Sequence, residues 1–252
     1  MAPEVRPMQG LEQLPWAEVW FHEVDEGSWR AASAGARALG KSGLEAWTTD
    51  GTPAVVEFLR GRGYEEVRRY VISELDVESA PDPAAPAFPL VTLAERPYLA
   101  EALFTIARES YCDQPGRSEQ RIESFDVWRS WGLDPHPAEA FFVALEGEGA
   151  LGYGFLDVDG AAATHGFMAV ARAARGRGVA GAIRRGQIAW AKAHGVRRLR
   201  TANETRLAGM LALNRGFGYR PLYEEIVLRG PLAAPAASGG AGAEAADRRR
   251  PG

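Results

Sequence analysis

The spacing of apolar positions predicts two helices followed by a run of strands in the middle of the chain. Residues 93–111 repeat apolar side chains at intervals of three and four, which places Leu99 and Ile106 on one face of a predicted helix. A shorter helix is predicted over 122–132. Between 140 and 170, apolar segments separated by Gly-containing turns predict three strands.

The residues that follow alternate between helical and extended patterns. A helix is predicted over 178–194, ended by a glycine, and a strand over 196–201. A second helix over 207–218 again ends in glycine, and a last strand occupies 219–230. This order of elements predicts a layered domain of the α/β or α+β class, with a mixed, mostly antiparallel sheet flanked by helices.

The N-terminal residues repeat the end of this domain at a separation of 155 residues. At this separation RGRGY at 60–64 aligns with RGFGY at 215–219, and Gly40 aligns with Gly195. Both segments show the order helix, glycine, strand, helix, glycine, strand, which favours an internal duplication over a chance similarity of two turns. The first copy is expected to be a half unit, because it lacks a counterpart of 91–165.

Two segments have the composition of connecting or terminal chain. Residues 77–89 are rich in Pro and Ala and are expected to form a linker. Residues 231–252 are of low complexity, with Leu232 as their large apolar residue, and are expected to be a disordered tail. The sequence is thereby divided into a unit at 1–76 and a domain at 90–230.

The composition excludes several classes of protein. The chain has 252 residues, 46% hydrophobic and 25% charged, and no window is apolar enough to span a membrane. Its single cysteine, Cys112, excludes an internal disulfide, and its four histidines are not spaced as metal ligands. We therefore expect no structural metal and, because the N-terminal residues lack a secretory pattern, a cytoplasmic location.

The net charge of −4 is unevenly distributed. Residues 1–80 carry 8 basic and 14 acidic side chains, whereas 171–200 carry nine Lys and Arg and no acid. Such a basic segment attracts an anion or is a solvated helix face. A nucleic-acid partner is disfavoured by the negative overall charge and by the lack of aromatic residues interleaved with the basic ones.

The segment HGFMAVARAARGRGVAGAIRRGQ at 165–187 is the most informative, because a strand leads through a Gly- and Arg-rich loop into a helix. Glycines let the backbone approach a ligand, and the first turn of a helix presents free N–H groups, so the loop suits a pyrophosphate. Gly176, Gly178 and Gly181 also spell the dinucleotide fingerprint G-x-G-x-x-G, but too few structured residues follow for a Rossmann sheet. A P-loop is excluded because G-K-[ST] is missing.

In this loop and its surroundings the chain resembles the GNAT superfamily of acyl-CoA-dependent N-acyltransferases. The resemblance covers about 90–230 and rests on R-x-x-G-x-A after the strand FMAV, on T-x-N at the end of the next strand, and on ML-x-LN-x-x-x-GY in the last helix. It implies the GNAT fold for this domain, preceded by a half GNAT-like unit, and acetyl-CoA as co-substrate.

The resemblance also implies three groups of acyl-CoA contacts: strand main chain for the pantetheine arm, the loop for the phosphates, and two asparagines at the thioester end. The pantetheine arm would pair with the main chain of Met168 and Val170. The phosphates would contact Arg175, Gly176, Arg177, Gly178, Val179 and Ala180. The thioester end would be lined by Asn203 and Asn214. Alternatively, Asn203 is the N-cap of a helix at 204–217, and Asn214 is an ordinary polar helix residue.

The sequence departs from the family pattern at the catalytic positions. Asn214 replaces the tyrosine that protonates the departing thiolate in many GNAT proteins, and the usual strand carboxylate would fall near Thr164. Direct attack of an amine on the thioester mainly needs juxtaposition and a strand N–H that polarises the carbonyl. His165 and Glu204 are candidates for proton transfer through water, although a packing or surface role is the more common explanation of each.

We therefore expect an N-acetyltransferase that moves an acetyl group from acetyl-CoA to a primary amine of unidentified nature. The N-terminal counterpart of the phosphate loop, at 20–25, has no glycine and two acids, so the half unit is expected to be structural or to shape the acceptor site. A homodimer is one way to cover its open sheet edge. The alternative function is a non-catalytic acyl-CoA-binding or sensor module.

Overall fold

The backbone follows the periodicities of the sequence closely. A computed structural model describes residues 3–8, 11–80, 85–113, 122 and 124–235. The helices are α1 (Glu26–Ala38), α2 (Pro53–Arg60), α3 (Ala100–Cys112), α4 (Phe125–Gly132), α5 (Val179–Ala193) and α6 (Ala208–Gly216). The strands are β1 (Val5–Pro7), β2 (Trp16–Trp20), β3 (Gly43–Thr49), β4 (Glu65–Asp76), β5 (Leu90–Thr92), β6 (Phe141–Glu146), β7 (Gly149–Asp159), β8 (Ala162–Val170), β9 (Arg198–Glu204) and β10 (Arg220–Pro231).

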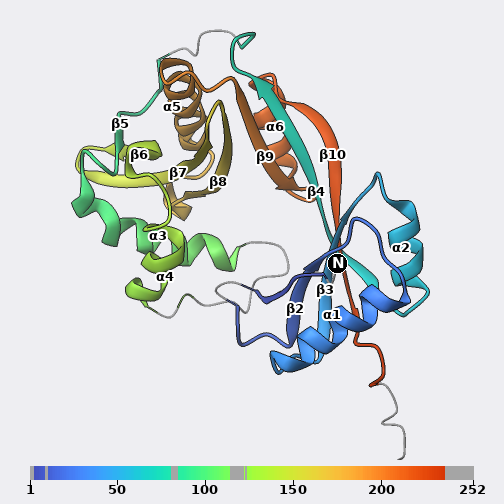
Figure 1. Cartoon of the computed structure of the whole chain (residues 1–252). Helices are drawn as coiled ribbons and strands as arrows, with labels where there is room; N and C mark the ends of the chain where they lie inside the picture. The colour runs from blue at the N-terminus through green and yellow to red at the C-terminus, as the bar shows by residue number, and fades with distance from the viewer. Residues whose placement is uncertain (1–2, 9–10, 81–84, 114–121, 123, 236–252) are drawn as a thin grey trace, which may run out of the picture.

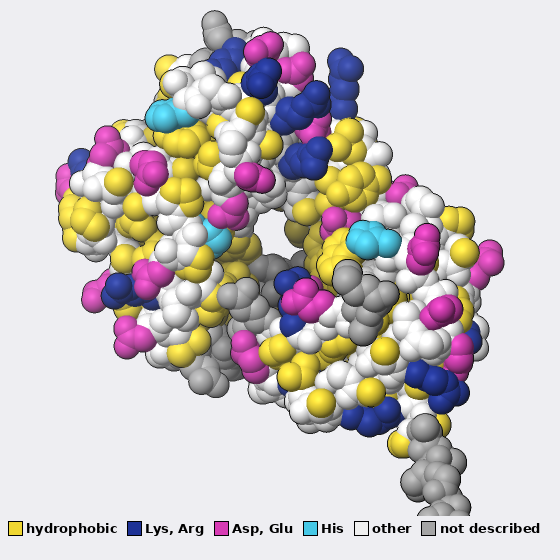
Figure 2. All heavy atoms as spheres, in the orientation of Figure 1, with side chains coloured by type: hydrophobic (Ala, Val, Ile, Leu, Met, Phe, Trp, Pro, Cys, Tyr) yellow, Lys and Arg dark blue, Asp and Glu magenta, His cyan; other side chains and the backbone are white. Residues whose placement is uncertain are grey.

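All these strands belong to one sheet, in the order β1-β2-β3-β10-β4-β9-β8-β7-β6-β5 (Figure 1). Two neighbouring pairs are parallel, β2 with β3 and β8 with β9, and the others are antiparallel. The predicted class, a mixed and mostly antiparallel sheet flanked by helices, is confirmed. Figure 2 shows an opening at the centre of the molecule, between the part that carries α3–α5 and the part that carries α1 and α2.

Local hydrogen bonds set the ends of the predicted elements. The helix predicted over 93–111 begins only at Ala100, because Glu95 Oε2 accepts from Thr92 N at 2.6 Å and keeps this segment in a turn. Helix α4 begins after Ser124, whose hydroxyl accepts from Val127 N at 3.2 Å. The short strands β1, β2 and β5 were not predicted, because none is long enough to show an alternating pattern.

The elements of the N-terminal part recur 155 residues later. Strand β3, helix α2 and strand β4 have their counterparts in β9, α6 and β10, and both strands match end to end. The pairing of β4 with β10 has the same symmetry, because adding 155 to one partner and subtracting it from the other gives another observed pair. Glu74 with Arg220 gives Glu65 with Arg229 in this way, and Tyr70 with Glu225, at the centre, gives itself.

The last strand of each half is inserted next to the other half. Strand β10 lies between β3 and β4, and β4 lies between β10 and β9. The sheet is therefore continuous across the sequence division proposed at 77–89. Residues at the start of that segment are packed: Val77 and Ala80 are buried, and Lys192 Nζ donates to the carbonyl of Ala80 at 2.8 Å.

The expectation of a disordered tail from residue 231 is wrong for its first residues. Pro231 ends β10, and Ala233 is buried against α1. The amide of Ala233 donates to Ser33 Oγ at 2.9 Å, and the Arg37 guanidinium contacts its carbonyl. A small side chain fits against the alanine-rich face of α1, and its backbone groups find partners there. Residues 236–252 lie outside the described part of the chain.

A buried ion pair crosses the junction of β3 and β10. The side chain of Glu45 on β3 is fully buried, and Arg229 Nε on β10 donates to its Oε2 at 2.7 Å. The Arg68 guanidinium on β4, which is also buried, donates to the other carboxylate oxygen. Because two arginines share this carboxylate, its loss would leave a buried positive charge uncompensated.

We predict that Glu45→Gln lowers the free energy of unfolding by about 3–5 kcal/mol, the usual effect of removing one partner of a buried pair. Urea denaturation of the full chain measures the effect. The matched control is Glu26→Gln on α1, whose side chain is 47% exposed and whose partners Arg30 and Arg62 are 51% and 27% exposed. Its loss should be at most about 1 kcal/mol, as for other surface pairs. Equal losses of unfolding free energy in the two variants would contradict the conclusion that the buried pairing of Glu45 stabilises the fold.

Candidate functional site

Strands β8 and β9 are paired over only part of their length. Pairing is confined to Ala162–Thr164 with Arg198–Arg200. Beyond Thr164, β8 continues along β7 as far as Val170, and β9 continues along β4, so the two strands diverge (Figure 1). In the N-terminal part, β2 and β3 stay paired over all five residues of β2. The edge of β8 that faces β9 is therefore open to an extended ligand.

A bulge redirects β8 at the point where the strands diverge. Gly154 pairs with Met168, but Leu156 pairs with His165, so β8 holds one extra residue against Phe155. At the bulge, the Phe155 ring would lie 1.9 Å from a Cβ atom at Gly166. Only glycine fits under this ring, and the bulge turns the adjoining main chain out of the regular ladder.

The predicted phosphate loop joins β8 to α5. After a 3₁₀ turn at Arg172–Ala174, Gly176 and Gly178 take left-handed conformations with φ of 75° and 88°. A Cβ at either glycine would meet no atom within 4 Å, so the loop faces open space. The carbonyl of Gly178 accepts the first bond of α5, and the N–H groups of the first helical turn lack partners within the helix. This is the geometry of an anion site.

Acidic residues hold the loop arginines. Arg175 Nη1 lies 2.7 Å from an oxygen of Asp113, and its Nε donates to the carbonyl of Val170 at 3.1 Å. Hydrogen bonds from Arg172 and then Arg175 lower the pKa of Asp113 to about 2. Arg177 pairs with Glu146 on β6. Both arginines predicted to contact phosphate therefore have carboxylate partners, and each remains 42% exposed.

The structure brings Asn203 and Asn214 together. Asn214 Nδ2 donates to Asn203 Oδ1 at 2.5 Å, and Thr201 Oγ1 donates to the same oxygen at 3.2 Å. Asn214 is 2% exposed, and its Oδ1 has no partner in the described part of the protein. The alternative role of Asn203 as an N-cap is wrong, because it lies within β9 and the N-cap of α6 is Leu207.

The two candidates for proton transfer lie in separate surroundings. His165 is buried beneath α5, with its Nε2 hydrogen-bonded to the hydroxyl of Tyr219. Burial, followed by the charge of Arg184, lowers the pKa of His165 well below 6.5, so its ring is neutral. Glu204 ends β9 and is engaged by the guanidinium of Arg206. His165 borders the bulge of β8, where it pairs with Leu156, whereas Glu204 pairs with Tyr70 on β4.

Sequence reasoning missed an aromatic cavity on the other side of the bulge. The cavity has a volume of about 220 Å³ and is bounded by α3, α4, β7, β8 and the turn after α4. Its lining residues are Tyr111, Trp128, Trp131, Gly132, His136, Tyr153, Phe155 and Phe167. These residues come from five separate segments, so no spacing in the sequence could have grouped them.

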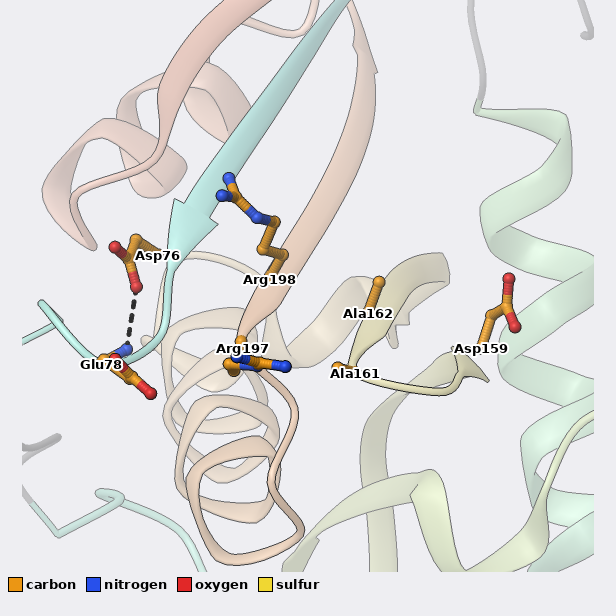
Figure 3. Close-up of a pocket in the computed structure, with 7 residues that line it drawn as sticks. All are labelled: Asp76, Glu78, Asp159, Ala161, Ala162, Arg197 and Arg198. Carbon is orange, nitrogen blue, oxygen red and sulfur yellow. Dashed lines mark hydrogen bonds between the residues drawn. The ribbon is translucent and has the colours of Figure 1, made fainter.

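A second, wider cavity lies at the paired end of β8 and β9, away from the loop. It has a volume of about 450 Å³ and is lined by Asp76, Glu78, Asp159, Ala161, Ala162, Arg197 and Arg198 (Figure 3). Asp76 accepts from Glu78 N at 3.1 Å. It has three acidic and two basic side chains, unlike the wholly basic loop before α5. In the described residues no group of His, Cys, Asp and Glu could hold a metal, and no helix is long and apolar enough to cross a membrane.

The divergent strands, the bulge and the glycine loop all lie within one part of the chain. Residues 100–219 match the model of the acetyltransferase (GNAT) family, so this part of the chain is a GNAT domain. The family and the fold are those of acyl-CoA-dependent N-acyltransferases.

Solved structures show the same fold over nearly the whole chain. A GCN5-related N-acetyltransferase from Sphaerobacter thermophilus is 17% identical with a TM-score of 0.72, and the match covers 91% of this chain and 76% of that one. A tandem GNAT protein from the clavulanic acid biosynthesis pathway, solved without AcCoA, is 20% identical with a TM-score of 0.62, covering 86% and 75%. A GCN5-related N-acetyltransferase from Kribbella flavida is 14% identical with a TM-score of 0.57, covering 86% and 82%. No curated protein sequence matches the chain.

We predict that His165→Gln flattens the dependence of stability on pH below about 6.5. The unfolded chain protonates this histidine with a pKa near 6.5, whereas the native chain does not. The unfolded state thus binds more protons, and stability falls as the pH drops below 6.5, by up to about 1.4 kcal/mol per pH unit. Urea denaturation between about pH 5 and pH 7.5 measures this slope. The control His22→Gln, at an exposed position, should keep the wild-type slope, and equal slopes in both variants would refute the argument.

Proposed function

We propose that the protein is an N-acetyltransferase that transfers an acetyl group from acetyl-CoA to a primary amine. The observation that carries the proposal is the open edge of β8, which leads directly into the glycine loop at the start of α5. An extended arm along a strand edge and a pyrophosphate at a helix N-terminus are the two features that acyl-CoA requires of its site.

The proposed contacts follow the path of β8. The main chain of Met168 and Val170 would pair with the pantetheine arm. The pyrophosphate would lie on the N–H groups of Arg177, Gly178, Val179 and Ala180, beside Gly176, with the arginine side chains near the phosphates. The unpartnered Oδ1 of buried Asn214, next to Asn203, is an acceptor that a ligand N–H or O–H group could satisfy.

The proposed reaction is direct attack. The amine nitrogen forms a bond to the thioester carbon, the carbon–sulfur bond breaks, and the departing sulfur gains a proton to give free CoA. A main-chain N–H at the bulge of β8 would polarise the carbonyl. Most of the rate enhancement would come from holding the two reactants together, which suits a site without the usual tyrosine and carboxylate.

We further propose that residues 1–76 are a degenerate half GNAT-like unit, joined by 77–89 to a catalytic domain at 90–230. Strand β2 does not diverge from β3, so the unit lacks an open strand edge. The N-terminus of α1 is closed by Asp25, whose carboxylate accepts from Ser28 N at 2.7 Å. A carboxylate there occupies the position that a phosphate would need.

Release of free thiol from acetyl-CoA, measured with the full chain and a panel of primary amines, tests the reaction. The proposal requires amine-dependent thiol release above the rate in buffer. Binding of acetyl-CoA without thiol release for any amine would favour the alternative of an acyl-CoA sensor, which the asparagine at position 214 and Thr164 in place of the carboxylate would explain.

We predict that Gly178→Glu abolishes acetyl-CoA binding, measured by titration calorimetry, with an affinity loss of at least about a hundredfold, or 2.7 kcal/mol. The side chain would stand in the ligand's path and repel its phosphates. The matched control is Gly195→Glu at the other end of α5, which has a φ of 74° and equally open surroundings. Both variants bear a similar left-handed backbone cost of about 1–2 kcal/mol, so stability should change equally. Unchanged affinity in Gly178→Glu would refute the loop assignment.

We predict a stoichiometry of one acetyl-CoA per chain. Among the described residues, the diverging strands and the uncapped start of α5 both lie in the second half, so saturation in calorimetry or native mass spectrometry should occur at one equivalent. Two bound equivalents would show that Asp25 and the fully paired β2 do not exclude the ligand.

A further inference from the structure

The aromatic cavity lies against the bulge of β8. Phe167, adjacent to Gly166, forms one wall, and its ring centroid lies 4.5 Å from that of Tyr111 on α3. Tyr153 on β7 closes another side, with its centroid 6.3 Å from that of Phe167. Along β8, Met168 and Val170 pack toward α5, whereas Phe167 and Ala169 pack toward α3 and α4. The cavity is therefore across the strand from the proposed acyl-CoA contacts, beside the point where the acyl group would end.

The walls suit a flat apolar group. Trp131 stands edge-on to Tyr111, with centroids 5.3 Å apart, and Trp128 is similarly placed against Tyr153. An apolar cavity of about 150 Å³ is large enough for benzene. A cavity of about 220 Å³ therefore accommodates one six-membered ring with a short chain. Aromatic faces also attract an ammonium group.

One side chain of the lining can accept a proton. His136 Nδ1 lies 2.5 Å from an oxygen of Asp157 on β7, and the His136 ring stacks on Phe155 at a centroid distance of 3.8 Å. A carboxylate can only accept a hydrogen bond, so Nδ1 carries the hydrogen and Nε2 of the neutral ring has a free lone pair. The His136 side chain is 16% exposed, and its contacts with Phe155 and Asp157 hold the ring in place.

We propose that this cavity is the acceptor site, that it takes a primary amine with a single aromatic ring, and that His136 is the base that deprotonates the amine. The inference rests on the proposed function and deepens it. Asp157 is a positioning residue, because it fixes the tautomer and orientation of the His136 ring and does not itself reach the amine.

The proton balance is complete with the groups named. The ammonium form of the amine gives one proton to Nε2 of His136, and its nitrogen lone pair then forms the bond to the thioester carbon. When the carbon–sulfur bond breaks, a second proton leaves the nitrogen and neutralises the thiolate. The products are the amide, free CoA and a protonated His136, which returns its proton to solvent.

The test compares 2-phenylethylamine with n-butylamine as acceptors for the full chain. We expect kcat/KM for the aromatic amine to exceed that for butylamine at least tenfold. Trp131→Ala should raise KM for 2-phenylethylamine about tenfold or more while leaving the affinity for acetyl-CoA, measured by calorimetry, unchanged.

The role of His136 is tested by His136→Asn. Asparagine can still donate to Asp157 from a similar position but has no atom at Nε2, so the local hydrogen bond is kept and the base is lost. We expect kcat to fall about 10²–10⁴-fold, the usual contribution of a positioned base, with little change in KM for the amine. Asp157→Asn should lower kcat less, again with KM preserved. The control is His194→Ala, at the exposed C-terminal end of α5, which should behave as wild type.

The outcomes separate the two proposals. If the chain binds acetyl-CoA and acetylates butylamine as well as 2-phenylethylamine, or if His136→Asn keeps its kcat, the inference is wrong and the proposed function stands. If the chain neither binds acetyl-CoA nor releases thiol, the proposed function fails and this inference fails with it.

Discussion

The antiparallel pairing of β4 with β10 is the contact on which the rest of the sheet depends. Strand β4 is the last strand of the first half, and β10 is the last strand of the second. In the sheet, β10 lies between β3 and β4, and β4 lies between β10 and β9. Every strand toward β1 is joined to the sheet through β10, and every strand toward β5 through β4. Because β9 is bonded to β4 along its whole length, it does not need β8 as a neighbour beyond Thr164. The divergence that exposes β8 is therefore supported from the other half of the molecule.

Charge reversal between the halves explains why the strands are exchanged. Arg229 on β10 faces Glu45 on β3, and Glu74 on β4 faces Arg200 on β9, both at 2.7 Å. The positions correspond at the separation of 155 residues, but the signs are opposite. If β4 paired with β3 and β10 with β9, glutamate would face glutamate and arginine would face arginine. Like charges directly opposite one another destabilise a strand pair, so these four residues select the observed order.

The sequence predicts what depends on local chemistry and misses what depends on contacts between distant segments. Helices α5 and α6 could be predicted because their periodicity and terminal glycines lie within one segment. The loop at Gly176 and Gly178 could be predicted because its left-handed backbone requires glycine. The exchange of β4 and β10 could not be predicted. The repeat in the sequence indicates which strands exist but does not determine which strands pair in the sheet.

The same limit applies to the site. The roles of the loop arginines depend on Asp113 and Glu146, which lie far from the loop in sequence. His136 has no periodic or motif signal, and its significance appears only when the fold brings Asp157 and Phe155 beside it. Asn203 shows the converse case: T-x-N was visible in the sequence, but only the position of Asn203 within β9 excluded its role as a helix cap.

The N-termini of α1 and α5 differ in how their free N–H groups are satisfied. At α1, Asp25 and Ser28 form reciprocal hydrogen bonds and satisfy the free N–H groups internally, which stabilises the helix and leaves nothing to bind. At α5, Gly178 supplies no side-chain cap and takes a backbone conformation that favours glycine, so the N–H groups stay available. Departures from the most stable local choice are expected where a ligand takes the place of a cap. The uncapped helix is thus less stable on its own, and the half with the capped helix supports it through β4 and the continuous sheet.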